Sequence, residues 1–75
     1  MAMEIAELAS DDWLSTFGQS LRSAREAAGY SRSKLARLLD MPEQNVKNWE
    51  TGRALPSLPH YVRIRRVLPD LPTPP

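Results

Sequence analysis

The feature that most constrains the fold of this chain is the spacing of apolar residues between Ser31 and Arg53. The first half of that stretch carries an apolar set at helical spacing. The second half places Val46 and Trp49 three residues apart, on one face of another helix. The apolar set of the first half consists of Leu35, Ala36, Leu38 and Leu39. The stretch therefore predicts two short helices that are joined by a tight turn and followed by an exposed loop.

The second of these helices, over about 42–51, carries polar side chains on the side away from its apolar pair. They form an outward row of one acid, two amides and one amine: Glu43, Gln44, Asn48 and Lys47. A short helix with one buried face and such a row is suited to reading a polar surface. The major groove of DNA admits a helix and presents hydrogen-bond donors and acceptors, so the row indicates DNA as a ligand.

Charge is distributed unevenly along the 75 residues. Residues 1–12 contain four acids and no cation, whereas the chain from Trp13 onward contains ten cations and five acids. A basic body fits an anionic partner, and nucleic acid is the commonest one. An ordinary mixed-charge surface would give the same counts, so charge alone leaves both interpretations open.

Several classes of protein do not fit the composition. Without cysteine there is no disulfide framework and no thiolate metal site, so helix packing has to stabilise this small chain. The apolar runs are too short to cross a membrane, and the N-terminus lacks a signal-peptide pattern, so we expect a cytoplasmic protein. His60 is the only histidine and has no orienting acid beside it. We therefore expect no metal, no cofactor and no enzymatic activity.

The remaining apolar residues predict one helix before this stretch and one after it. The earlier helix spans about 11–28, with Ser10 or Asp11 as its N-cap and a possible break near 15–18 because of Gly18. Its apolar stripe consists of Trp13, Phe17, Leu21, Ala24 and Ala28. The later helix is capped by Ser57, and its apolar face consists of Leu58, Tyr61, Ile64, Val67 and Leu68.

These elements divide the chain into three segments. Residues 1–12 form an acidic arm or short helix, 13–68 a helical domain, and 69–75 a proline-rich extended tail. The expected fold is all-α, a compact bundle of four to five helices without strands.

The chain resembles the lambda-repressor-like helix-turn-helix family, which includes Cro and the phage repressors of the XRE type. The resemblance covers about residues 17–68 and is carried by LRSAREAAGYSRSKLARLLDMPEQNVKNWETGRALPS. The matching positions are Leu21, Arg22, Arg25, Gly29, Ser31, Leu35, Ala36, Val46, Trp49, Glu50, Gly52 and Pro56. Two positions depart from the pattern: Asp40 stands where relatives usually have glycine, and Pro42 where they have serine or threonine.

The resemblance implies a role for each group of polar residues. Arg25 and Glu50 would form an ion pair between the first helix and the end of the third. The outward row would contact base edges. Phosphates would be bound by Arg22, Ser31, Arg32, Asn45 and Arg53.

The implied function is a sequence-specific, double-stranded DNA-binding regulator, most simply a small repressor or autoregulator in a bacterial cell or phage-infected host. We expect a homodimer on an inverted repeat. Its dimer surface would be either the N-terminal segment around Ile5, Leu8 and Trp13, or the fourth helix with Leu68 and Leu71.

Two other functions fit the same fold. One is an antitoxin-like or adaptor module that binds a protein partner, for which the acidic and apolar N-terminal segment is the best support. The other is a phage excision or architectural factor, which would bend its DNA site.

Overall fold

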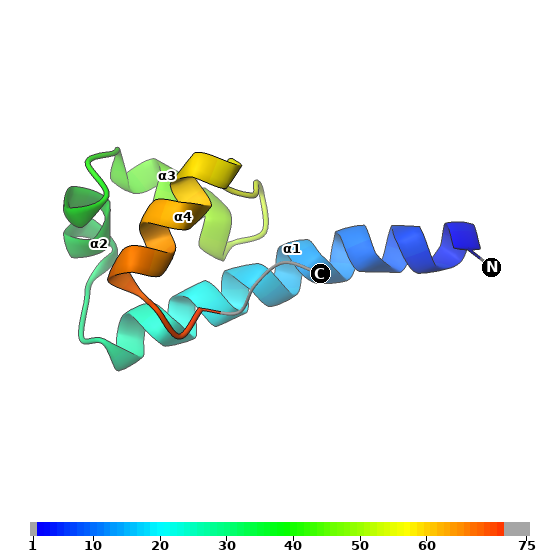
Figure 1. Cartoon of the computed structure of the whole chain (residues 1–75), viewed down its shortest axis with the longest axis horizontal. Coiled ribbons are helices and arrows are strands. Elements are labelled where there is room, and N and C mark those ends of the chain that lie inside the picture. The colour runs from blue at the N-terminus through cyan, green and yellow to red at the C-terminus, as the bar shows by residue number, and fades with distance from the viewer. Residues whose placement is uncertain (1, 72–75) are drawn as a thin grey trace.

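A computed structural model describes the backbone of residues 2–71 and the side chains of residues 14–71. Over those residues it contains four α-helices and no strand: α1 (Ala2–Ala27), α2 (Arg32–Leu38), α3 (Glu43–Glu50) and α4 (Leu58–Val67). The last three gather against the C-terminal half of α1 (Figure 1). The expected all-α helical bundle is confirmed.

The first helix differs from the sequence-based expectation. α1 is uninterrupted over 26 residues, about 39 Å at 1.5 Å per residue. Ser10 and Asp11 therefore lie inside the helix and do not begin it, and Gly18 does not break it. Because no proline occurs in α1 and Gly18 is its only glycine, the helix can continue through all three residues. Its N-terminal half extends away from the other helices (Figure 1).

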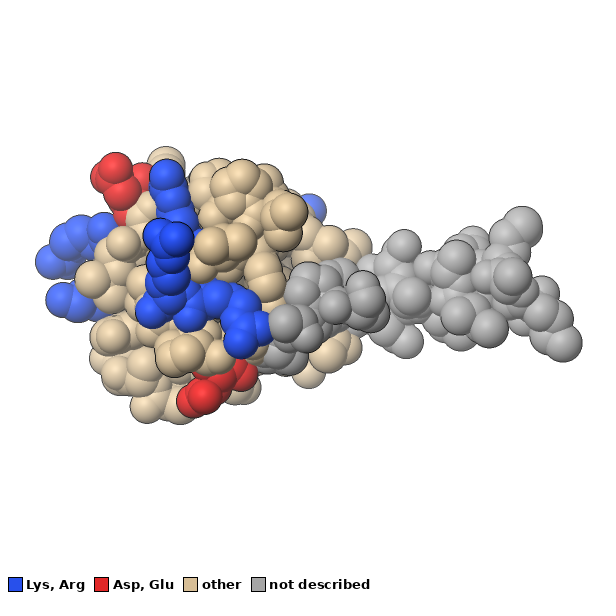
Figure 2. All heavy atoms as spheres, viewed as in Figure 1, with Lys and Arg blue, Asp and Glu red and all other residues tan. Residues whose placement is uncertain are grey.

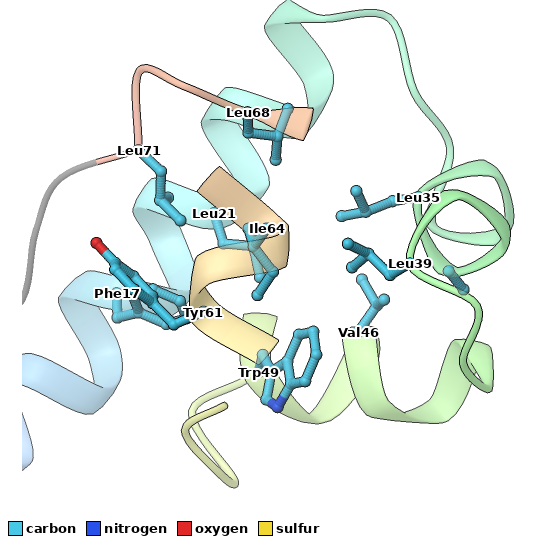
Figure 3. Packing of buried hydrophobic residues seen from close by; sticks show 11 residues of the cluster. Phe17, Leu21, Leu35, Leu39, Val46, Trp49, Tyr61, Ile64, Leu68 and Leu71 are labelled. Atoms are coloured by element: carbon cyan, nitrogen blue, oxygen red, sulfur yellow. The ribbon is translucent and has the colours of Figure 1, made fainter. Parts of the chain in front are cut away.

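One hydrophobic core joins all four helices (Figure 3). Phe17 of α1 packs against Tyr61 of α4, with their ring centroids 5.9 Å apart. Trp49 is buried in the same cluster, so it is a core residue and not a platform for stacking on bases. The buried residues of this cluster are Phe17, Leu21, Leu35, Ala36, Leu39, Val46, Trp49, Tyr61, Ile64, Leu68 and Leu71.

The end of the chain corrects two expectations. Leu68 and Leu71 are both buried, and Leu71 is 1% exposed after a turn in which its N–H donates to the Leu68 carbonyl at 3.1 Å. Side chains that fill the core of one copy cannot also line a dimer surface. The packed domain therefore includes residue 71 and does not end at 68.

Leu38, which we expected on the apolar face of α2, is exposed.

Candidate nucleic-acid interface

The two helices predicted between Ser31 and Arg53 pack against each other. Ser31 caps α2, because its hydroxyl oxygen accepts a hydrogen bond from the Lys34 N–H at 3.0 Å. The connection to α3 is residues 39–42, and Asp40 adopts a left-handed conformation with φ 56°. Aspartate is one of the few residues besides glycine that tolerate this conformation, so the turn forms without the glycine of the family pattern.

A side-chain hydrogen bond joins the start of α3 to α2. The Ser33 hydroxyl donates a hydrogen bond to Oε1 of Glu43 at 2.8 Å. Pro42, which precedes the helix, makes no side-chain capping bond. Glu43 is exposed, but its carboxylate is directed by this bond toward α2. The bond fixes the approach of the two helices at their solvent side.

The rest of the outward row lies on the face of α3 opposite Val46 and Trp49. Gln44 and Lys47 are exposed, and Asn48 is half-buried. The Gln44 side-chain amide donates to Oδ1 of Asn48 at 2.9 Å, one helical turn along. The structure therefore brings Gln44 and Asn48 together as a pair of amides with further donors and acceptors available to a ligand.

Glu50, at the other end of α3, carries a buried carboxylate. Its side chain is 0% exposed and accepts from Arg25 in a bidentate arrangement, with Nε–Oε2 at 2.6 Å and Nη2–Oε1 at 3.1 Å. Nη1 of Arg25 also donates to the Tyr30 carbonyl at 2.8 Å. Glu50 accepts from the charged guanidinium and thereby raises the pKa of Arg25 above its ordinary value.

Arg32 shares that carboxylate. Its Nε lies 3.0 Å from Oε1 of Glu50, and its side chain is 29% exposed. Sequence reasoning assigned Arg32 to a phosphate but did not connect it with Glu50. The contact links the first residue of α2 to the last residue of α3. It also leaves part of the guanidinium at the surface, beside the N-terminus of α2.

The other residues expected to bind phosphate lie in different surroundings. Arg53 is exposed in the loop after α3, and Asn45 is half-buried in the first turn of that helix. The Ser31 hydroxyl is engaged in capping α2. Arg22 lies on the exposed side of α1, where it pairs with Glu26 at 3.2 Å.

Gly18 is a residue that sequence reasoning did not connect with this site. A Cβ added to it would lie 2.6 Å from the Glu50 carbonyl oxygen and 2.7 Å from that of Trp49. α1 therefore passes directly over the backbone at the end of α3, and only glycine permits this approach. A lone glycine inside a long helical pattern is the signal that could have indicated it.

A short capped helix, a tight turn and a second helix with a polar outward face define the helix-turn-helix class of DNA-binding domains. A family model described as a helix-turn-helix domain matches residues 16–68. The chain belongs to this family. Neither the curated proteins nor the solved structures give a significant match to it. Within the described residues, no helix has the length and apolar character needed to cross a membrane.

Proposed function

We propose that this protein is a sequence-specific transcriptional regulator of the lambda-repressor-like type that inserts α3 into the major groove of DNA. The observation that carries the proposal is the two-sided character of α3. Val46 and Trp49 anchor one side in the core, while Gln44, Lys47 and Asn48 lie on the other. The simplest role for a domain of this size is a repressor that controls its own promoter, in a bacterium or a phage.

The outward row of α3 supplies the base contacts in this proposal. Gln44 and Asn48 each carry an amide, the group that pairs bidentately with adenine, and Lys47 donates to guanine acceptors or to a phosphate. Glu43 accepts from the cytosine amine and repels phosphates, which disfavours wrong sequences. The Gln44–Asn48 hydrogen bond uses the Gln44 Nε2 donor and the Asn48 Oδ1 acceptor, which leaves Gln44 Oε1 and Asn48 Nδ2 for a base.

Phosphate contacts position the helix in the groove. Arg32 is the strongest candidate, because Glu50 holds one edge of its guanidinium while the side chain remains partly exposed. Ser31 and the first N–H groups of α2 lie beside it, Asn45 lies in the first turn of α3, Arg53 follows that helix, and Arg22 contributes from α1. These contacts set the register on the duplex and much of the affinity, but they carry no sequence information.

A single domain of this size contacts few base pairs. We therefore propose a homodimer on an inverted repeat, with half-sites about one helical turn, or ~34 Å, apart. Such an arrangement doubles the number of bases read.

The experiment that tests the proposal is selection of bound duplexes from a random library, followed by fluorescence anisotropy at two salt concentrations. The selected duplex and the protein's own promoter are compared with a scrambled duplex. We expect preference for the selected sequence, an inverted repeat within it, and a steep fall in affinity with salt. A variant with alanine at Gln44, Lys47 and Asn48 should lose the sequence preference. The control variant Arg37→Ala, which changes an exposed side chain of α2, should keep it.

Other outcomes point to the two alternatives. Weak binding that is equal on all duplexes would contradict the regulator and favour a protein-interaction module. Strong bending of the selected duplex, measured by its gel mobility, would favour an architectural factor.

A further inference from the structure

The exposed side of α4 carries an apolar stripe that the core does not use. Leu58 and Val62 are 73% and 44% exposed, and with Arg66 they recur at spacings of four residues, on one line along the helix. We name Leu58, Val62 and Arg66 the α4 stripe. Arg63, beside it, is also exposed. Cationic side chains gather over α4 on the face seen in Figure 2. Two large apolar side chains bordered by arginines form a surface suited to an acidic, amphipathic helix.

The sequence of this same chain contains such a helix. The N-terminal half of α1 has four acids and no cation in residues 1–12. Glu4, Leu8 and Asp12 recur at spacings of four, which places them on one line of a helix, with Ile5 next to it. We name these three residues the α1 stripe. It matches the α4 stripe in period and opposes it in charge.

The two stripes cannot meet within one copy. α1 is continuous from Ala2 to Ala27, so its N-terminal half cannot fold back without breaking the helix. Figure 1 shows this half directed away from α4. The long axis of the molecule is 42 Å, against 22 and 21 Å for the others, which is consistent with a helix that extends past the bundle. A helical segment of about 12 residues is marginal in water without a packing partner.

We propose that the α1 stripe of one copy docks on the α4 stripe of a second copy, and that the reciprocal contact forms at the same time. This is the self-complementary arrangement of a twofold dimer, in which every contact occurs twice. Pairing two α1 stripes would bring Glu4 and Asp12 of one copy against the same acids of the other, and pairing two α4 stripes would bring arginines together. Only the mixed pairing brings opposite charges together.

The inference rests on the homodimer of the proposed function and specifies its surface. Neither stripe includes a residue assigned above to DNA, so both functions can operate in the same dimer. Leu58 and Val62, exposed in one copy, would be covered in the dimer together with Leu8. The paired charges would fix the orientation of the partner helix.

The test is sedimentation analysis of the full chain over a range of concentrations, with two charge-reversed variants. One carries Arg63→Glu and Arg66→Glu on α4, and the other carries Glu4→Lys and Asp12→Lys on α1. Each variant alone should raise the dimer dissociation constant about tenfold or more, because like charges then oppose each other across both contacts. Arg65 is left unchanged because it donates to the Pro69 carbonyl at 3.2 Å.

Mixing the two variants is the decisive measurement. In a mixed dimer both contacts again pair opposite charges, so the dimer should return to within about threefold of the wild-type dissociation constant. Restoration by mixing also shows that both variants are folded. Lys34→Glu with Arg37→Glu, which reverses two exposed cations on α2, is the matched control and should leave the wild-type dimer unchanged. Glu7→Lys, outside the α1 stripe, is the corresponding control for the acidic helix.

Three results would overturn the inference: a wild-type chain that stays monomeric at every concentration, a dimer that tolerates the α4 reversals, or variants that do not restore each other. If the α4 reversals weaken binding to the selected duplex while the dimer persists, those arginines contact DNA instead. Sequence preference of the wild-type chain is measured separately by anisotropy, so failure of this dimer and failure of the DNA-binding function are distinguishable.

Discussion

The Glu50 carboxylate accepts hydrogen bonds from two arginines on different helices, Arg25 of α1 and Arg32 of α2. Its burial means that water cannot replace a lost partner. No buried polar side-chain atom among the described residues lacks a hydrogen-bond partner, so this cluster is satisfied as it stands. Changing one member of such a buried charge cluster is strongly destabilising, because it leaves a buried charge without compensation.

Glu50→Gln should therefore be strongly destabilising. The substitution keeps the size of the side chain but leaves two guanidinium groups against a neutral amide, and we expect a loss of about 3–5 kcal/mol in the free energy of unfolding. Urea denaturation measures it. Arg22→Gln is the control, since its pair with Glu26 is more than half exposed and should contribute less than about 1 kcal/mol. Equal effects of the two substitutions would contradict the role of burial.

Arg32→Ala should weaken binding to every DNA sequence to a similar degree. Loss of one phosphate contact lowers the slope of log affinity against log salt by about one unit. The slope is measured by anisotropy at four salt concentrations on the selected and scrambled duplexes. An unchanged slope would mean that Arg32 serves only the Glu50 cluster.

Gln44→Ala, unlike Arg32→Ala, should weaken binding to the selected duplex more than to other sequences. Removal of one bidentate amide contact should cost about 1–3 kcal/mol on the selected duplex and relax the preference at one base pair, with little effect on the salt slope. Competition against the single-base variants of the site measures this. A uniform loss on all of them would remove Gln44 from the residues that read sequence.

At the scale of elements, the contact between α1 and α3 depends on the missing side chain of Gly18. In an exposed helix, replacing glycine by alanine stabilises by about 0.5–1 kcal/mol. Here the added Cβ would lie within 3 Å of two backbone carbonyl oxygens, which cannot rotate away. The helices would have to separate, and this would loosen the Arg25–Glu50 pair that joins them.

Gly18→Ala should consequently destabilise the domain by about 1–3 kcal/mol, the usual cost of overpacking. The free energy of unfolding is again the measurement. Gly29→Ala gives a useful contrast, because its φ is +79° and no atom lies within 4 Å of an added Cβ, so it reports backbone strain without a clash. Stabilisation by Gly18→Ala would show that α1 and α3 do not approach this closely in solution.

The turn between α2 and α3 shows how a departure from the family pattern is accommodated. Asp40 adopts the left-handed conformation that glycine has in relatives, and the Met41 N–H donates to the Ala36 carbonyl at 3.0 Å, closing the end of α2. The Ser33–Glu43 bond links the two helices on the solvent side. The helix-turn-helix geometry thus forms with a non-glycine turn residue.

At the scale of the whole molecule, the segment after α4 closes the core. Leu71 lies beyond the end of α4 at Val67, and its side chain points into the core toward Leu21 and Tyr61 (Figure 3). The segment expected to be an extended tail therefore contributes one of the most buried side chains of the domain.

Leu71→Ala should cost about 2–5 kcal/mol, because it removes a buried leucine side chain and leaves a cavity in the core. Leu58→Ala, at a position 73% exposed, should change stability by less than about 0.5 kcal/mol. Thermal or urea unfolding of both variants checks the difference. A neutral Leu71→Ala would mean that the core ends with Leu68.

Much of this protein could be predicted from local patterns. Helical spacing is sufficient to indicate α2, α3 and α4, because one buried face imposes a period of about 3.6 residues on the sequence. The outward row of α3 follows from the same periodicity, and the Ser31 cap follows from the capping chemistry of serine, since each depends on neighbours within one or two turns of helix. The pairing of Arg25 with Glu50 was expected from the family resemblance and not from the periodicity.

Tertiary structure decided the features that depend on residues far apart in the chain. The close approach at Gly18, the sharing of Glu50 by Arg32 and the burial of Leu71 each involve a partner that local spacing does not identify. The continuity of α1 through Gly18 belongs to the same group, because a helix propensity of about 1 kcal/mol is smaller than the packing energy of a helix against a core. Local sequence determined which helices form, and long-range packing determined where they end and which side chains they share.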